Sequence, residues 1–224
     1  MLFRSMETFG TVLARLENRL TAANIFCGHG YESIHDEAVG LMLGAAGLPP
    51  EQSRELLAAP FPANAMERLA LMLQERCEDR LPTAYVLGEA WLAGISFKCD
   101  SRALVPRSPI AQVLLAACRP WWGPSLPPRT IVDLCCGGGS LGIIAAHVFP
   151  SSAVWLSDID RDALSLAAEN IQRCGLNKRV HGVLGDLLTP FDTQSIDLIL
   201  ANPPYVSTIE MSDLPPEYQI GRAH

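Results

Sequence analysis

The sequence predicts an α/β protein in which half of a doubly wound parallel sheet follows a small helical bundle and a β-hairpin. Three observations predict this fold. Apolar residues recur at helical spacing through residues 6–83, the period changes to alternation around residue 94, and strands alternate with helices after residue 129. We therefore expect a helical domain over 1–83, a hairpin and linker helix over 84–128, and an α/β domain over 129–224.

The helical domain is expected to contain four helices. Residues 6–26 carry apolar side chains at helical spacing, and a second helix is expected to start at the N-cap Ser33 and to stop at Gly47. A short helix is expected over 51–59, and a longer one after Pro62 that ends before Pro82. Their apolar stripes are expected to form the core of a bundle.

Residues 84–105 alternate around Ala93-Gly94, which predicts a β-hairpin. The segments expected to be extended are 85–87, 90–92, 95–99 and 103–105. A helix is expected over 109–119, and a proline-rich connector follows it at 120–128. A domain boundary is therefore expected within about 106–129.

The remaining chain is expected to form four parallel strands with helices between them. The strands are expected at 130–134, 153–157, 179–184 and 196–201, and the helices at 140–148 and 161–174. Gly175 is expected to stop the second of these helices. The last strand is short, apolar and rich in β-branched residues, as is typical of a buried parallel strand.

Composition and charge narrow the class of protein. The chain has 224 residues, 49% of them hydrophobic, and a net charge of −7. This charge argues against tight binding to a nucleic-acid backbone, which needs clustered Lys and Arg, and it would suit a basic protein partner. The seven cysteines form no Cys-x-x-Cys pair, so we expect reduced thiols in a cytoplasmic protein.

Membrane, secretion and metal signals are weak. No apolar segment is long enough to span a membrane, and the N-terminus lacks the order of a signal peptide. His29, His35 and Asp36 fit no standard metal-ligand spacing, so we expect no metal there and prefer a structural or recognition role.

The sequence Asn202-Pro203-Pro204-Tyr205 ends the last expected strand. The two prolines forbid further strand pairing and fix the backbone as it leaves the sheet. A carboxamide, bare carbonyls and an aromatic ring are therefore expected at the C-terminal edge of the sheet, where open α/β sheets bind ligands. An ordinary turn is the simpler alternative, because Asn-Pro is common in turns.

This motif is similar to the signature of methyltransferases that use S-adenosylmethionine to methylate a planar amide or amine nitrogen. The lone pair of such a nitrogen is delocalised, so it attacks a methyl sulfonium poorly unless it is held and polarised. The Asn202 oxygen and the Pro203 carbonyl can accept its two hydrogens, and the Tyr205 ring can face the sulfonium. We therefore predict Asn202, Pro203 and Tyr205 as catalytic residues, and Asn202, Pro203, Pro204 and Tyr205 as substrate-binding residues.

A glycine-rich segment, Asp133-Leu134-Cys135-Cys136-Gly137-Gly138-Gly139, opens the first strand–helix turn. Glycines let the backbone approach a ligand where a side chain would collide. Asp158 lies 19 residues past Gly139 at the end of the second strand, where a carboxylate can accept both ribose hydroxyls. Asp133 is expected near the amino group of the cofactor.

A dinucleotide such as NAD is a competing ligand, because NAD-binding folds share this pair of features. The spacing of the loop is not Gly-x-Gly-x-x-Gly, and no arginine adjoins it to accept a diphosphate. Adenosylmethionine carries no phosphate, so a loose glycine loop suffices for it. These features, with Asn202–Tyr205 on the fourth strand, favour adenosylmethionine.

Two further positions are open to more than one interpretation. Asp186 follows the third strand, where an Asp commonly borders an adenine, although a strand-ending turn explains it equally well. Cys135 and Cys136 could form a redox pair, but packing under the glycine loop is favoured because no activating cation adjoins them.

The chain resembles the HemK-type protein-glutamine methyltransferases over about residues 7–218, and it is most similar to their PrmB branch. The general motifs are the glycine-rich segment, Asp158 and Asn202–Tyr205. The branch motifs are Phe26-Cys27-Gly28-His29-Gly30, Asp36-Glu37-Ala38, the segment 104–110 and the segment 211–215.

The resemblance implies a helical substrate-recognition domain, a hairpin linker and a Rossmann-like class I methyltransferase domain. It implies S-adenosyl-L-methionine as cofactor and a glutamine in a ribosomal protein of the large subunit as substrate. Phe97 and Arg107 resemble the hairpin segment that closes over the cofactor. The residue after Asp186 is an aromatic cofactor contact in the release-factor branch, and it is Leu187 here. The predicted cofactor contacts are Asp133, Cys135, Cys136, Gly137, Gly138, Gly139, Asp158, Asp186, Leu187, Asn202, Phe97 and Arg107.

Three other functions stay open at this point. A release-factor glutamine methyltransferase shares the general motifs but not the branch motifs. An adenine methyltransferase acting on nucleic acid must also methylate a nitrogen with a delocalised lone pair, but it would need a basic face and a base-flipping pocket. A non-catalytic cofactor-binding module is the third alternative.

The two ends of the chain lead to a further expectation. Leu2-Phe3-Arg4-Ser5 and Ile220-Gly221-Arg222-Ala223-His224 resemble a translated sequencing adapter, so we expect the natural gene to continue past about Gln219. A class I sheet has seven strands, of which the resemblance leaves only the first four within this chain. We therefore expect the C-terminal strands to be missing, and the chain to bind cofactor weakly or to precipitate.

Overall fold

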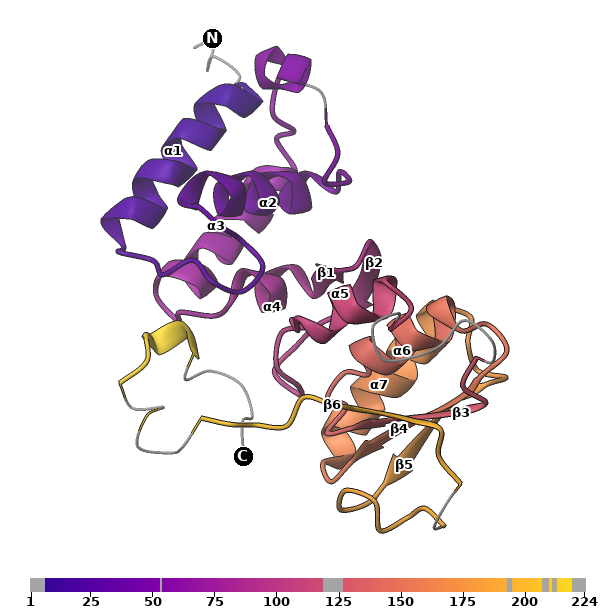
Figure 1. The fold of residues 1–224 in the computed structure, drawn as a ribbon. Coiled ribbons are helices and arrows are strands. Elements are labelled where there is room, and N and C mark those ends of the chain that lie inside the picture. Colours follow the sequence, from indigo (N-terminus) through magenta and orange to yellow (C-terminus); the bar gives the residue numbers. More distant parts are fainter. Residues whose placement is uncertain are drawn as a thin grey trace, which may run out of the picture. The chain divides into compact units, whose positions relative to one another are not determined.

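The structure, a computed structural model, describes residues 7–52, 54–118, 127–192, 195–206, 210 and 213–218 (Figure 1). The chain forms two compact units. One comprises Met1–Leu87 with Leu214–Ile220, and the other comprises Gly88–Asp213 with Gly221–His224. The adapter-like ends, residues 120–126 of the expected connector and residues 211–212 of a branch motif lie outside the described residues.

The first unit is a bundle of helices around one apolar core. Its elements are α1 (Phe9–Ala22), α2 (Ile34–Ala46), the 3-10 helix η1 (Arg54–Ala58), α3 (Ala65–Cys77), α4 (Thr83–Leu87) and the 3-10 helix η2 (Pro216–Tyr218). The Ser33 side chain accepts from Asp36 N–H at the start of α2, and Gly47 ends α2 with a φ of +68°. Both predicted ends of this helix are therefore confirmed. Leu16, Leu41 and Leu69 lie fully buried in the core.

The second unit begins with an antiparallel hairpin of β1 (Glu89–Leu92) and β2 (Ile95–Lys98). Ala93 and Gly94 form its turn with φ values of +53° and +75°, as a two-residue type I′ turn requires. The predicted hairpin is thus confirmed at its centre.

The outer segments of the predicted hairpin are wrong. Residues 85–87 belong to α4, because Tyr85 and Val86 donate their N–H groups to the Pro82 carbonyl and turn the chain into a helix. Residues 103–105 form no strand, because Ala103 N–H donates to the Asp100 carbonyl in a turn. The linker helix α5 is shorter than expected, spanning Ile110–Leu115, and the helix expected over 51–59 is the 3-10 helix η1.

Four parallel strands follow in the order β5-β4-β3-β6. They are β3 (Thr130–Leu134), β4 (Ala153–Asp158), β5 (Val180–Leu184) and β6 (Leu198–Ala201), and the intervening helices are α6 (Ser140–Val148) and α7 (Arg161–Arg173). Helices α6 and α7 lie on one side of the sheet (Figure 1). The predicted half of a doubly wound sheet is confirmed, with strand starts that differ by one or two residues at Val180 and Leu198.

The order of the strands locates the functional edge of the sheet. The chain moves outward from β3 to β4 and β5, and then returns to the other side of β3 to form β6. Open α/β sheets bind their ligands at such a switch point, outside the carboxyl ends of the strands. This switch point lies between β3 and β6, which carry the glycine-rich segment and Asn202–Tyr205 at their carboxyl ends.

Candidate active site

The strand register sets the predicted motifs side by side. Leu134 at the end of β3 pairs with Ala201 of β6 on one side and with Ser157 of β4 on the other. The next residues along these strands, Cys135, Asn202 and Asp158, therefore leave the sheet in one row. Neighbouring strands lie about 4.8 Å apart, so the three residues define one narrow edge.

The glycine loop, Cys135–Gly139, turns sharply between β3 and α6. Cys135, Gly137 and Gly139 have φ values of +53°, +52° and +80°. A Cβ atom on Gly139 would lie 2.6 Å from Leu156 Cδ1 and 3.2 Å from Ala167 Cβ. Packing and backbone conformation both require glycine at this position. The loop therefore presents backbone rather than side chains to the edge of the sheet.

Asp158 joins the glycine loop to the end of β4. Its Oδ2 atom accepts from Gly137 N–H at 2.8 Å, and its Oδ1 atom accepts from Asp160 N–H at 3.0 Å. An ionised carboxylate has about four acceptor positions. The half-buried Asp158 side chain therefore keeps acceptor positions for a pair of ligand hydroxyls.

Asp133 lies beneath the loop and is only 1% exposed. Its Oδ2 atom accepts from Gly142 N–H at 2.8 Å, so it binds an otherwise unpaired donor in the first turn of α6. Burial raises the pKa of Asp133 to about 7 against the opposing effect of this hydrogen bond, and the charge of Asp158 adds to the rise. The observed partner of Asp133 is α6, and its proximity to a cofactor amino group stays a prediction.

A buried amide that the sequence reading missed supports the loop. Asn170 of α7 is 0% exposed. Its Oδ1 atom accepts from Lys98 N–H at 2.7 Å, and its Nδ2 atom donates to the Gly138 carbonyl at 2.9 Å. One side chain thus links β2 to the glycine loop. The available signal was a polar residue on the apolar face of α7, where Ala163, Leu166 and Ala167 recur at helical spacing.

The two cysteines of the loop have raised pKa values. Burial raises the pKa of Cys135 and raises that of Cys136 well above the usual range, and the nearby carboxylates of Asp133 and Asp158 add to both rises. A thiol acts as a nucleophile through its thiolate. The raised pKa values of both thiols therefore support the packing role that the sequence favours over a redox role.

The Asn202–Tyr205 motif is exposed along its whole length, and Tyr205 is 78% exposed. The preceding Leu200 is buried and pairs in register with Asp133. The buried strand β6 therefore holds the start of the motif in place, while the four side chains of the motif remain accessible to a ligand.

The other predicted site residues differ in exposure. Asp186 and Arg107 are exposed, as is Leu187, whose carbonyl accepts from Ser157 Oγ at 3.3 Å. Phe97 is 0% exposed and packs in the core of the second unit. Its burial leaves no free surface in this structure, so a direct contact between Phe97 and a cofactor stays a prediction that packing does not support.

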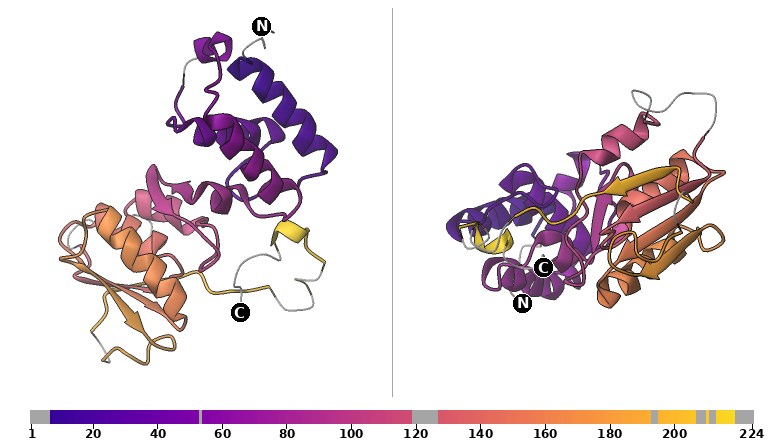
Figure 2. Two further views of the ribbon diagram at one scale, coloured as in Figure 1. Left: turned by 180° about the vertical axis from the view of Figure 1, so that it is seen from behind. Right: turned by 60° about the horizontal axis from the view of Figure 1, so that its bottom comes forward.

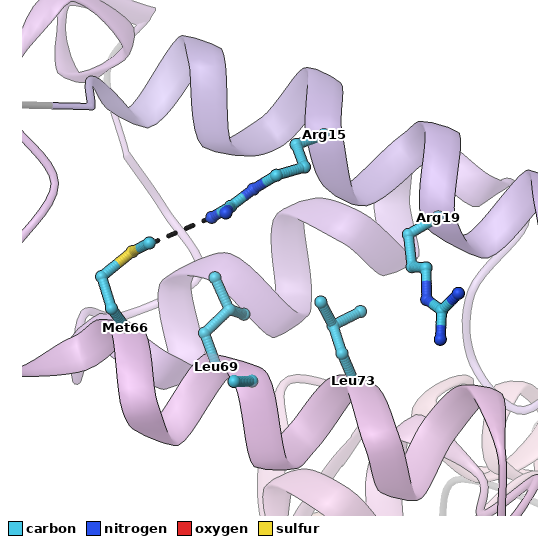
Figure 3. A pocket seen from close by; sticks show the side chains of 6 residues that line it. Arg15, Arg19, Met66, Leu69 and Leu73 are labelled. Carbon is cyan, nitrogen blue, oxygen red and sulfur yellow. Dashed lines mark hydrogen bonds between the residues drawn. The ribbon is translucent and has the colours of Figure 1, made fainter.

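A separate apolar hollow of about 240 Å³ lies on the first unit between α1 and α3 (Figure 3). Its lining residues are Arg15, Arg19, Met66, Leu69, Ala70 and Leu73. The two arginines form ion pairs with Glu7 and Glu78. The lining contains no carboxylate, amide or hydroxyl side chain, so it offers no acceptor or base for catalysis.

The histidines considered for a metal site have other neighbours. His35 Nδ1 lies 2.6 Å from Glu17 Oε1, and the His29 ring lies 4.3 Å from the ring of Tyr218. Within the described ranges, no three His, Cys, Asp or Glu residues gather in an arrangement that could hold a metal ion. A search of the helices in the same ranges finds none with the length and apolar character needed to cross a membrane.

Comparison with known proteins places these observations in a class. Residues 115–214 match the Methyltransferase small domain family. Solved structures similar to the chain include a putative S-adenosyl-L-methionine-dependent methyltransferase from Methanococcus maripaludis, with 25% identity, a TM-score of 0.35 and coverage of 41% of this chain and 39% of that one. Another is TrmN from Thermus thermophilus, with 32% identity, a TM-score of 0.35 and coverage of 42% and 27%. The fold and the family match define a methyltransferase with a Rossmann-like class I domain.

Curated relatives give the particular family. The chain is 38% identical over 216 residues to the ribosomal protein uL3 glutamine methyltransferase of Bordetella pertussis, covering 96% of this chain and 72% of the relative. It is 41% identical over 201 residues to the protein of the same name from Xanthomonas campestris, covering 90% of this chain and 65% of the relative. The chain belongs to the family of ribosomal protein uL3 glutamine methyltransferases, and it spans about two thirds of the length of these relatives.

The cofactor that this family implies is S-adenosyl-L-methionine, and the residues at the switch point fit it. Asp158 retains acceptor positions for ribose hydroxyls, and the glycine loop offers backbone without side-chain obstruction. No Lys or Arg lies within Cys135–Gly139 to bind a diphosphate. The donor set therefore suits a nucleoside without phosphates better than a dinucleotide.

Proposed function

We propose that this chain transfers a methyl group from S-adenosyl-L-methionine to the side-chain amide nitrogen of a glutamine in ribosomal protein uL3. The observation that carries the proposal is the register of β3 and β6, which sets Asn202 beside the glycine loop at the switch point. The names of the curated relatives support the choice of substrate. A ribosomal substrate implies action in the cytoplasm, and we assign its recognition to the helical unit.

The Asn202–Tyr205 motif positions the glutamine in this mechanism. The Asn202 Oδ1 atom and the Pro203 carbonyl accept the two hydrogens of the substrate amide, which holds the nitrogen with its lone pair exposed. Pro204 fixes the backbone that carries these acceptors, and Tyr205 packs its ring on the amide plane. The exposure of all four residues supports their access to a protein substrate.

The remaining residues hold the methyl donor. The cofactor supplies an electrophilic methyl sulfonium, the chemistry that an amide nitrogen needs. Asp158 would bind its ribose hydroxyls, and the glycine loop would leave backbone accessible to it beside Asn202. No side-chain base is required, because the amide proton becomes acidic as the new nitrogen–carbon bond forms. Catalysis then depends chiefly on positioning.

The net charge of −7 favours a protein substrate over a nucleic acid. Ribosomal proteins bind RNA and are commonly basic, so an acidic enzyme attracts them and repels the phosphates of RNA. This charge counts against the adenine methyltransferase alternative, which would need a basic face to bind nucleic acid.

Replacement of Asn202 tests this proposal. In Asn202→Ala, the substrate amide loses one acceptor, and we expect kcat to fall by about 10²-fold or more. The cofactor Kd should change by a few-fold at most, because Asp158 and the glycine loop are untouched. Labelled-methyl transfer to uL3 gives kcat, and calorimetry gives Kd.

The exposed Asn18 of α1 provides a matched control for this substitution. Asn18→Ala should leave both kcat and Kd at the wild-type values. Equal losses of kcat and cofactor affinity in Asn202→Ala would assign Asn202 to cofactor binding instead. An unchanged kcat would remove it from the site.

A further inference from the structure

The buried amide of Asn170 is an unusual group for its place in the second unit. It lies inside α7 and is 0% exposed, among the apolar side chains of Leu166, Ala167 and Ile171. Asparagine is a weak helix former, and burial of an amide is costly unless its polar atoms are hydrogen-bonded. Helix formation and core packing would both favour an apolar residue here. The presence of Asn170 therefore needs a reason outside α7.

The hydrogen bonds of Asn170 use both ends of its amide. Its Oδ1 atom accepts from Lys98 N–H at 2.7 Å. Its Nδ2 atom donates to the Gly138 carbonyl at 2.9 Å and to the Lys98 carbonyl at 3.2 Å. These partners fix the orientation of the amide, because the N–H needs an oxygen and the two carbonyls need N–H groups. Among side chains of this length, only asparagine carries an acceptor and two donors.

One side of this contact is the end of the hairpin. Cys99 N–H donates to the Gly88 carbonyl across the hairpin, so the backbone groups of Lys98 point away from β1. Figure 2 shows α7, in orange, lying along the sheet, and β2 lies against the same helix. Lys98 Nζ also pairs with Glu169 of α7, but both side chains are partly exposed, and such pairs contribute little. Asn170 is therefore the buried connection between β2 and α7.

The other side of the contact is a peptide group of the glycine loop. The peptide that joins Gly138 to Gly139 is held at both of its polar atoms. Its carbonyl accepts from Asn170, and its N–H donates to the Cys136 carbonyl at 2.8 Å. Three successive glycines, 137–139, have more backbone freedom than other residues and carry no side chains to restrict it. Contacts from outside the loop must therefore supply its order.

Packing places the glycine loop against the same helix. A Cβ atom on Gly138 would lie 3.4 Å from Leu166 Cδ2 and 3.5 Å from Asn170 Nδ2. Ala103, in the turn after β2, is buried against Leu166, and its Cβ would lie 3.6 Å from a Cβ atom on Gly137. The loop, α7 and the segment after β2 therefore meet around Asn170.

We propose that Asn170 is a positioning residue that holds the glycine loop in its cofactor-binding shape before the cofactor arrives. The consequence for binding rests on the function proposed above. A ligand that meets an ordered loop does not bear the entropy cost of ordering three glycines. Without the amide, this cost is added to cofactor binding, so the cofactor affinity falls. Asn202 is untouched, so kcat at saturating cofactor should remain.

Amide hydrogen exchange of the cofactor-free chain tests the hold on the loop. In Asn170→Ala, peptides covering residue 98 and residues 136–139 should exchange faster relative to peptides of β4. Ile171→Ala is the matched control, because it removes a neighbouring buried side chain of α7 without removing a hydrogen bond to the loop. In this control, the same peptides should keep their wild-type exchange relative to β4.

Calorimetry with S-adenosyl-L-methionine tests the consequence for binding. Asn170→Ala should raise the cofactor Kd by about tenfold, the size of one hydrogen bond, whereas Ile171→Ala should stay within about twofold of wild type. A merely structural role would lower the fraction of chain that binds and leave Kd unchanged. Asn170→Asp is a second variant, which keeps the side-chain volume and the acceptor for Lys98 N–H. When ionised it has no donor for the Gly138 carbonyl, so Kd should rise as in Asn170→Ala.

The kinetic readout separates cofactor binding from turnover. With uL3 as substrate, Asn170→Ala should raise the cofactor KM and leave kcat at saturating cofactor within about twofold of wild type. Unchanged exchange at 136–139 would overturn the hold on the loop. Equal rises of Kd in Asn170→Ala and Ile171→Ala would reduce Asn170 to a core residue. If the wild type binds no S-adenosyl-L-methionine, the proposed function fails, while exchange at 136–139 still decides whether Asn170 holds the loop.

Discussion

At the scale of single residues, the site combines exposed polar groups with buried ones that support them. Asn202 and Tyr205 face solvent, whereas Asp133 and Asn170 are buried and bind backbone groups. The buried pair fixes the start of α6 and the glycine loop.

The raised pKa of Asp133 makes stability depend on pH. Burial raises this pKa from 3.8 to about 7, so the folded chain binds one proton more than the unfolded chain between these values. The stability contributed by the protonated carboxyl is therefore complete below about pH 4 and is lost as pH rises through the folded pKa. The slope is at most about 1.4 kcal/mol per pH unit for one proton.

Asp133→Asn should flatten this dependence. Asparagine cannot ionise, and its oxygen can still accept from Gly142 N–H. The free energy of unfolding, measured with urea between about pH 5 and pH 8, should fall less steeply with pH than in the wild type. The exposed Asp192→Asn is the control and should keep the wild-type slope. Parallel curves for Asp133→Asn and wild type would show that Asp133 does not titrate in this range.

Residue types predicted part of the site and missed the rest. The positions of Asn202–Tyr205 and Asp158 at one edge of the sheet could be predicted, because each follows a predicted parallel strand. Asn170 gave only the signal of a polar residue on an apolar helix face, and its partner Lys98, 72 residues away, left no pattern that links the two. The buried state of Phe97 also depends on packing that spacing does not show.

At the scale of elements, the turn between β3 and α6 is constrained both by packing and by backbone conformation. Gly139 and Gly175 both have positive φ values, +80° and +68°. A Cβ atom on Gly139 would collide with Leu156, whereas a Cβ atom on Gly175 meets no atom within 4 Å. A comparison of substitutions at the two glycines therefore distinguishes the cost of backbone strain from the cost of a steric collision.

Alanine substitution at each glycine tests this difference. Gly175→Ala should cost about 1 kcal/mol from the left-handed backbone alone. Gly139→Ala should cost about 3 kcal/mol, because overpacking against Leu156 and Ala167 adds to the same strain. Urea unfolding of the two variants measures both losses. Equal losses would mean that the packing around Gly139 relaxes without cost.

Alternating apolar residues and turn or cap residues predicted the elements whose bounds depend on residues close together in the sequence. The β1–β2 hairpin follows from Ala93-Gly94, and α2 follows from Ser33 and Gly47. The strand expected at 85–87 is a helix, because its N–H groups bond locally to Pro82 rather than across a sheet. Apolar residues alone do not distinguish these two outcomes in a short segment.

At the scale of the whole molecule, the chain crosses between its two units more than once. The helical unit is completed by Leu214–Ile220, which follow the sheet in sequence. Glu217 contacts Phe26 across 191 residues of sequence. Such long-range contacts leave no periodic pattern, so the return of this segment could not be predicted, whereas the α/β alternation that defines the sheet could.

The acidic charge and the family both point to one substrate class. The most direct measurement is mass spectrometry of ribosomal protein uL3 after incubation with the chain and S-adenosyl-L-methionine, with Asn202→Ala in parallel. We predict a gain of one methyl group on a glutamine side chain of uL3 with the wild type and a large loss of this product with Asn202→Ala. Methyl groups that appear on RNA instead, or on uL3 equally with both proteins, would contradict the account.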